Sequence, residues 1–226
     1  DAFHSTEAHM NNYGIEVFVY NEFFKHRMAE KAEWHYIEAG SNDGISDSIT
    51  IEFERQLGWK GILVEPIASV LEQCKQVRSA THNLFLNCGL GKQYGHLHLE
   101  VPKLNTGNSS FAMCDAHREQ LTDLGLLNEG VHLLNCVVLS YADICMLNGN
   151  KQIDLFGLDV EGFENTVLQQ MVADINLGLV KPPTVLVCEF YWCDREEMKS
   201  ILSQHYDLVK EYPYDYVFHL KAEFCQ

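Results

Sequence analysis

The spacing of apolar residues along the chain switches repeatedly between the pattern of a strand and that of a helix. Apolar runs predict buried strands at residues 36–39, 61–65, 83–88, 155–160, 184–190, 207–212 and 214–220. Apolar residues at helical spacing predict helices at residues 44–57, 66–78, 163–175 and 196–204. This alternation predicts an α/β fold, with a mostly parallel seven-stranded sheet and helices on both of its faces.

Two parts of the chain depart from this alternation. Residues 1–33 carry a helical stretch around Val17, Phe18 and Phe24, and predict an N-terminal helical segment. Residues 89–142 show short alternating runs at 96–101 and 131–139, with one short helix near 115–124, and predict a β-rich insertion after the third strand. We expect residues 1–226 to form a single domain with these two additions.

A glycine turn follows the first predicted strand. Gly40 has no Cβ, so the chain turns sharply there and a ligand can lie against bare backbone. Gly44 is expected to open the next helix, whose apolar stripe includes Ile49 and Phe53. Glu65 stands about 20 residues beyond the turn, where an acidic side chain typically accepts hydrogen bonds from both ribose hydroxyls of an adenosine ligand. The pattern therefore favours an adenosine-containing cofactor.

The residues of this turn indicate which adenosine cofactor fits. The segment 40–44 lacks the Gly-x-Gly-x-x-Gly spacing that brings a pyrophosphate onto a helix N-terminus, and Asp43 stands where phosphates would lie. A dinucleotide therefore fits poorly. A cationic ligand tolerates the nearby acids Glu38, Asp43 and Glu65, since opposite charges attract.

Several motifs together resemble one enzyme family. The segments 37–44, 57–66, 105–110 and 153–164 resemble motifs of the FkbM family of S-adenosylmethionine-dependent methyltransferases, over about residues 23–190. The resemblance implies a Rossmann-like class I methyltransferase fold with an antiparallel last strand, S-adenosylmethionine as cofactor, and O-methylation of a hydroxyl on a small molecule or glycan. An NAD-dependent oxidoreductase and a catalytically silent Rossmann-like binding domain stay open as alternatives.

Ligands of open α/β sheets bind outside the carboxyl ends of the strands, and this rule assigns roles to the residues there. The methionine portion is expected on Glu38 and residues 40–44, the ribose on Glu65, and the adenine on the turn 87–90. Asp159 and Glu161 would face the acceptor, and Asp159 or Glu189 would remove its proton. The predicted cofactor-binding residues are Glu38, Gly40, Ser41, Asn42, Gly44, Glu65, Pro66, Cys88, Gly89 and Asp159. The predicted catalytic residues are Asp159, Glu161 and Glu189.

Metal ligands are weakly indicated by the sequence. The cysteines show no Cys-x-x-Cys spacing, so a zinc site is not expected. His96 and His98 share one face of a strand but have no evident third ligand. Magnesium held by Asp159, Glu161 and Glu189 is kept as an alternative, because carboxylate oxygens suit that ion. The main interpretation has no metal.

Charge narrows the choice of partners. The chain has 16 basic and 32 acidic residues, a formal net charge of −16, which disfavours nucleic acid and leaves small neutral or cationic acceptors open. No run of about 18 apolar residues is present, so no membrane span is expected. With thiols expected to be reduced, a cytoplasmic location is favoured. The chain begins at Asp1 and not at a methionine, which leaves an upstream targeting segment open.

Overall fold

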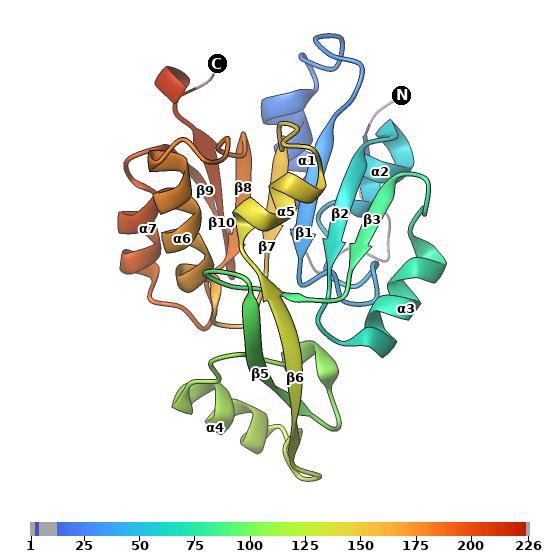
Figure 1. Cartoon of the computed structure of the whole chain (residues 1–226), viewed down its shortest axis with the longest axis vertical. Coiled ribbons are helices and arrows are strands. Elements are labelled where there is room, and N and C mark those ends of the chain that lie inside the picture. Colours follow the sequence, from blue (N-terminus) through green and yellow to red (C-terminus); the bar gives the residue numbers. More distant parts are fainter. Residues whose placement is uncertain (1–2, 5–12, 225–226) are drawn as a thin grey trace.

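The main sheet of the molecule has seven strands in the order β3-β2-β1-β7-β8-β10-β9, in a computed structural model that describes residues 3–4 and 13–224 (Figure 1). The strands are β1 His35–Ala39, β2 Lys60–Val64, β3 Asn83–Leu86, β7 Leu155–Leu158, β8 Val185–Glu189, β9 Tyr206–Glu211 and β10 Asp215–Leu220. Only β10 runs antiparallel to its neighbours β8 and β9. The predicted fold class and the antiparallel last strand are both confirmed.

Helices cover both faces of this sheet because each face presents a continuous apolar surface. One core cluster packs against α5 Tyr141–Leu147, α6 Glu164–Asn176 and α7 Arg195–Leu202. The other packs against α1 Ile15–Val19, the π-helix η2 Tyr20–Phe24, α2 Ile51–Leu57 and α3 Ala68–Val77. Within the predicted N-terminal helical segment, residues 1–33, the described residues form the helices α1 and η2.

The first helix after the glycine turn begins later than expected. The prediction that it opens at Gly44 is wrong, because α2 starts at Ile51. The Glu38 carboxylate accepts hydrogen bonds from the Ser48 hydroxyl at 2.9 Å and the Thr50 hydroxyl at 2.8 Å, and from the Ile49 backbone N–H. These bonds draw residues 48–50 over the end of β1 and compete with helical bonding in this stretch.

A second, smaller sheet follows β3, as predicted. It has the order β4-β6-β5, with strands β4 Gly89–Leu90, β5 Gly95–Pro102 and β6 Val131–Leu139. The short helix α4 Asp115–Asp123 and the 3₁₀ turn η3 Thr106–Asn108 join β5 to β6. Figure 1 shows this insertion below the main sheet, beyond the carboxyl ends of its parallel strands, with α4 beside β5.

Helix α5 was not predicted. It begins directly after the insertion with a capping box, in which Ser140 and Asp143 each bond the backbone N–H of the other. The Ser-x-x-Asp pattern was the available signal, but the helix is too short for its apolar spacing to stand out. Among the described residues, no helix combines the length and apolar character needed to cross a bilayer.

Candidate active site

A cleft of about 600 Å³ opens between the carboxyl ends of the main-sheet strands and the insertion. The ends of β1, β2, β7 and β8 form one wall, and residues 105–109 with Phe111 of the insertion form another. Tyr214 and Asp215 also line it, because β10 is antiparallel and begins at the edge where its neighbours end. This is the position at which open α/β sheets bind their ligands.

Gly40 lies at the tightest point of this edge. Its φ is +84°, and a Cβ added there would lie 1.8 Å from the backbone carbonyl oxygen of Asp159. The N–H groups of Gly40 and Ser41 both donate to the Val64 carbonyl, at 3.1 and 3.0 Å. The turn is therefore held between β2 on one side and the end of β7 on the other, and only glycine fits there.

Glu65 follows β2 and is 6% exposed. Its Oε1 accepts the Ile67 N–H at 2.8 Å and its Oε2 accepts the Asn42 N–H at 3.2 Å. Burial raises the pKa of Glu65 to about 7, against these two hydrogen bonds, which lower it. The side chain is thus fixed in orientation at the cleft wall, and each oxygen keeps a lone pair for a ligand hydroxyl.

If Glu65 binds the ribose of S-adenosylmethionine, as the sequence predicts, Glu65→Gln should weaken cofactor binding by about 1.5–3 kcal/mol, which is roughly a 10- to 100-fold rise in Kd. The amide keeps the shape of the side chain but lacks the negative charge that Glu65 carries above its pKa of about 7, so the titration is run at pH 8. Calorimetric titration measures the change. Glu72→Gln on the exposed surface of α3 is the matched control. An unchanged Kd in Glu65→Gln would show that Glu65 does not bind the ribose.

Glu38 also borders the cleft, but its oxygens are already engaged. Besides the three bonds from residues 48–50, Oε2 accepts from Arg78 Nη1 at 3.2 Å. Arg78 lies fully buried between Glu38 and Glu54, with its Nε 2.6 Å from Glu54 Oε2. Glu38 therefore holds residues 48–50, which lie over the end of β1 beside the cleft. Its contact with the methionine portion of the cofactor stays a prediction.

The structure gathers most of the predicted site residues around the cleft and leaves a few behind its wall. The predicted residues that line the cleft are Glu38, Gly40, Asn42, Glu65, Pro66, Gly89, Asp159, Glu161 and Glu189. Ser41, Gly44 and Cys88 are buried and do not line it. At Gly44, an added Cβ would meet the Cys74 sulfur at 2.7 Å, so this glycine allows close packing on α3.

The far end of the cleft is strongly acidic. Asp159, Glu161, Glu189 and Asp215 line it, and none of the described residues of the cleft wall is a lysine, arginine or histidine. Burial, followed by repulsion from Asp159 and Glu161, raises the pKa of Glu189 to about 12. Burial and then Glu164 raise the pKa of Glu161 to about 8, and burial with Asp47 raises that of Asp215 to about 6.

Asp159 belongs to the same acidic group. Asp159 is exposed, and it lines the cleft. The protein around the cleft nevertheless shields its carboxyl group from bulk water. Burial, followed by repulsion from Glu161 and Glu164, raises the pKa of Asp159 well above its usual range. These carboxylates repel one another when the cleft holds no positive charge, so a cationic ligand would stabilise their ionised forms.

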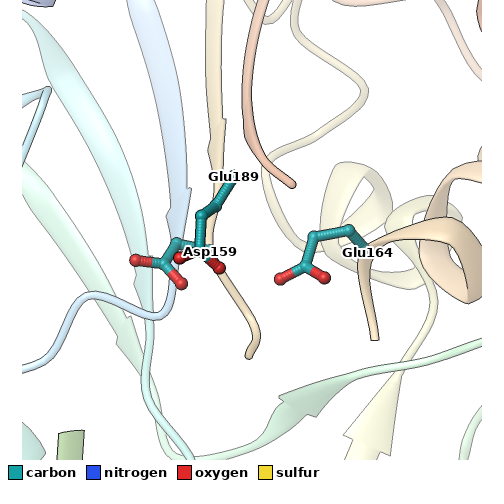
Figure 2. Close-up of side chains that lie close together, drawn as sticks. All are labelled: Asp159, Glu164 and Glu189. Carbon is teal, nitrogen blue, oxygen red and sulfur yellow. The ribbon is translucent and has the colours of Figure 1, made fainter. Parts of the chain in front are cut away.

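Figure 2 shows Asp159, Glu189 and Glu164 converging, and they offer oxygens within 4.8 Å of one another. The magnesium alternative named Glu161 as third ligand, whereas Glu164 completes this group. Glu164 accepts the N–H groups of Val160 at 2.7 Å and Gly162 at 3.0 Å. Carboxylate oxygens are ligands that magnesium accepts. Both oxygens of Glu164, however, already accept backbone N–H groups of the loop before α6.

Several residues at the cleft carried no role in the sequence interpretation. Asp215 and Tyr214 follow a proline near the end of the chain, and only strand order brings them to the site. The insertion reaches Glu161 through Asn108, which donates to Oε1 at 3.4 Å, and Ser110, whose hydroxyl donates to the Glu161 carbonyl at 2.6 Å. Segment 105–110 is one of the motifs that resemble the FkbM family, but its sequence does not predict these contacts with Glu161.

Comparison with known proteins gives the family. A family model described as a methyltransferase FkbM domain matches residues 38–216. Among curated proteins, none matches the sequence. The motifs from residue 38 onward thus fall within one matched region, which extends beyond residue 190 into β10.

Two solved structures match the chain at low sequence identity. An FkbM methyltransferase from Methylobacillus flagellatus is 14% identical, with a TM-score of 0.48, over 97% of this chain and 56% of that one. The human methyltransferase 10 domain containing protein is 10% identical, with a TM-score of 0.47, over 96% and 84% of the two chains. The chain thus spans little more than half of the Methylobacillus protein. With the family match covering most of its length, the chain belongs to the FkbM family of methyltransferases.

Proposed function

We propose that the protein transfers a methyl group from S-adenosylmethionine to a hydroxyl of a small molecule or glycan. The observation that carries this proposal is the cleft itself. It joins the buried acid Glu65, placed as a ribose-binding acid would be, to an acidic wall whose described residues include no basic side chain. Such a wall favours a ligand with a positive charge, and it opposes the phosphates of a dinucleotide.

The residues divide the cleft into a cofactor end and an acceptor end. Glu65 and the Asn42 backbone, which are bonded to each other, would hold the ribose next to the bare backbone of Gly40. S-adenosylmethionine supplies, when bound, a methyl group on a cationic sulfur. Asp159 at the end of β7 and Glu189 at the end of β8 would then border the acceptor.

The acceptor hydroxyl must lose its proton as its oxygen forms the new bond to carbon. Asp159 and Glu189 have raised pKa values in the ligand-free cleft, and a neighbouring positive charge lowers the pKa of a carboxyl group. A bound cationic donor would therefore ionise a carboxyl group that can take this proton. Holding oxygen, methyl and sulfur in line supplies much of the remaining rate enhancement.

Cofactor titration followed by turnover tests the proposal. We expect calorimetry to show binding of S-adenosylmethionine and none of NAD. Glucose, glucosamine and glucuronate then serve as hydroxyl acceptors that differ in charge, with S-adenosylhomocysteine as the measured product. The acidic wall predicts turnover of glucosamine or glucose above that of glucuronate. NAD binding without S-adenosylmethionine binding would contradict the proposal.

Asp159→Asn should lower the rate of methyl transfer by about 100-fold or more while cofactor affinity changes far less. The amide keeps the size and hydrogen bonding of the side chain but cannot take a proton at neutral pH. Glu189→Gln is the parallel test, and Asp123→Asn at the exposed end of α4 is the control. Wild-type turnover in both site variants would show that neither carboxylate is the base.

A further inference from the structure

His117 is a buried histidine whose side chain has no hydrogen bond. It lies in α4 of the insertion, is 0% exposed, and neither ring nitrogen has a partner among the described residues. Its ring stacks on Trp192, with centroids 4.1 Å apart and planes 11° apart. Nearly all buried polar groups are hydrogen-bonded, so an unpaired imidazole in this position requires an explanation.

The nearest charged atom explains the position of this ring. His117 Nε2 lies 3.8 Å from Glu161 Oε2, and that oxygen is buried without a hydrogen bond of normal length among the described residues. The Trp192 side chain also lies near the Glu161 carboxyl group and acts to lower its pKa. Asn108 holds the other oxygen, Oε1, on the side of the cleft. Donor and acceptor thus face each other at a separation that must shorten to about 2.9 Å to form a hydrogen bond.

Burial lowers the pKa of His117 to about 4, so the imidazole is neutral near pH 7 and offers one N–H donor. Glu161 has a φ of +54°, a left-handed conformation that is unfavourable for a residue with a side chain. The Ser110 hydroxyl bonds its carbonyl and helps to hold that conformation. The insertion therefore contacts Glu161 through the three side chains of Asn108, Ser110 and His117.

We propose that His117 is a positioning residue for Glu161, donating a hydrogen bond from Nε2 to Oε2 once cofactor and acceptor fill the cleft. The inference rests on the proposed methyltransferase function. With Oε2 held in this way, Oε1 faces the cleft and is oriented to accept a hydrogen bond from the acceptor. The acceptor O–H bond breaks, its proton passes to Asp159 or Glu189, and its oxygen bonds the methyl carbon. The carbon–sulfur bond breaks, with its electron pair remaining on sulfur.

Three variants separate this role from a merely structural one. His117→Phe keeps an aromatic ring on Trp192 but cannot donate, so we expect kcat to fall about 10-fold or more, as expected for a lost catalytic orientation. The KM for S-adenosylmethionine should stay within about twofold, because uniform binding is unaffected. His117→Gln, which can still donate, should recover part of kcat, and the exposed-strand variant His98→Gln should leave it unchanged.

Thermal unfolding provides the second measurement. The phenyl ring of His117→Phe leaves no unpaired polar atom in the same space, so its Tm should equal or exceed that of the wild type. A lower kcat with an undiminished Tm is the expected result. A wild-type kcat in His117→Phe would overturn the proposal. A fall in kcat accompanied by an equally large rise in the KM for S-adenosylmethionine would also overturn it.

A test without turnover distinguishes this inference from the function on which it rests. With ¹⁵N-histidine labelling, S-adenosylhomocysteine together with the hydroxyl acceptor should shift the Nε2–H resonance of His117 in the wild type, and less in Glu161→Ala. Binding of both ligands with no change at His117, in an enzyme that methylates this acceptor, would overturn the positioning role alone. An absence of cofactor binding would overturn the proposed function itself.

Discussion

Gly40→Ala is expected to lower the free energy of unfolding by about 4 kcal/mol or more, at the upper extreme for single substitutions. The added methyl carbon would lie 1.8 Å from the Asp159 carbonyl oxygen, so β1 and β7 would have to separate at their carboxyl ends. Those ends are paired, with Ala39 opposite Leu158. Chemical denaturation of the purified variant measures the loss, and cofactor binding should disappear with it.

Gly58→Ala is the matched control for this substitution. Gly58 also has a positive φ, of +68°, but an added Cβ there would meet no atom within 4 Å. Its replacement isolates the cost of a left-handed conformation, about 1–2 kcal/mol. Similar losses at both positions would show that β7 does not approach Gly40 as closely as described.

Arg78→Met is the second substitution with a large expected effect. Its guanidinium joins Glu38 and Glu54, which are both buried, and also donates to the Tyr36 hydroxyl at 2.7 Å. Removing the cation leaves two buried carboxylates unpaired, and breaking a buried pair in this way costs about 3–5 kcal/mol. The free energy of unfolding, measured by urea denaturation at pH 7, reports this loss.

Arg118→Met provides the comparison for Arg78. Arg118 pairs with Glu100 at 2.6 Å, but its side chain is 42% exposed, and exposed pairs contribute about 1 kcal/mol or less. Equal losses of stability in Arg78→Met and Arg118→Met would contradict the central position of Arg78.

Arg78→Met should also weaken cofactor binding, because Arg78 donates to the Gly44 carbonyl and so holds the loop after β1.

The sequence predicted the elements whose signal is local and missed the contacts that depend on tertiary structure. The apolar run before Gly40 and the acid at Glu65 are local, and both lie where they were expected at the cleft. The late start of α2 depends on the Glu38 carboxylate, which bonds residues 48–50 and overrides a helical stripe that includes Ile49.

The same distinction applies to the candidate site. Asp215 reaches the cleft only because β10 inserts antiparallel between β8 and β9, and the sequence around Asp215 carries no signal of that position. His117 stands in a polar helix with nothing in its spacing to separate it from a surface residue. Its burial follows from the contact of α4 with Trp192, which is 75 residues away along the chain.

The chain enters and leaves the insertion at one place. Gly89 and Leu90 pair in parallel with Val138 and Leu139, so the outgoing and returning segments are adjacent where they join the main sheet. A segment whose ends meet can change length or sequence without shifting the register of the strands that carry Gly40 and Glu65. In evolution, the cleft wall formed by residues 105–109 and Phe111 is therefore free to diversify while Gly40 and Glu65 are retained. Grafting residues 91–137 between relatives is a rational route to new acceptors.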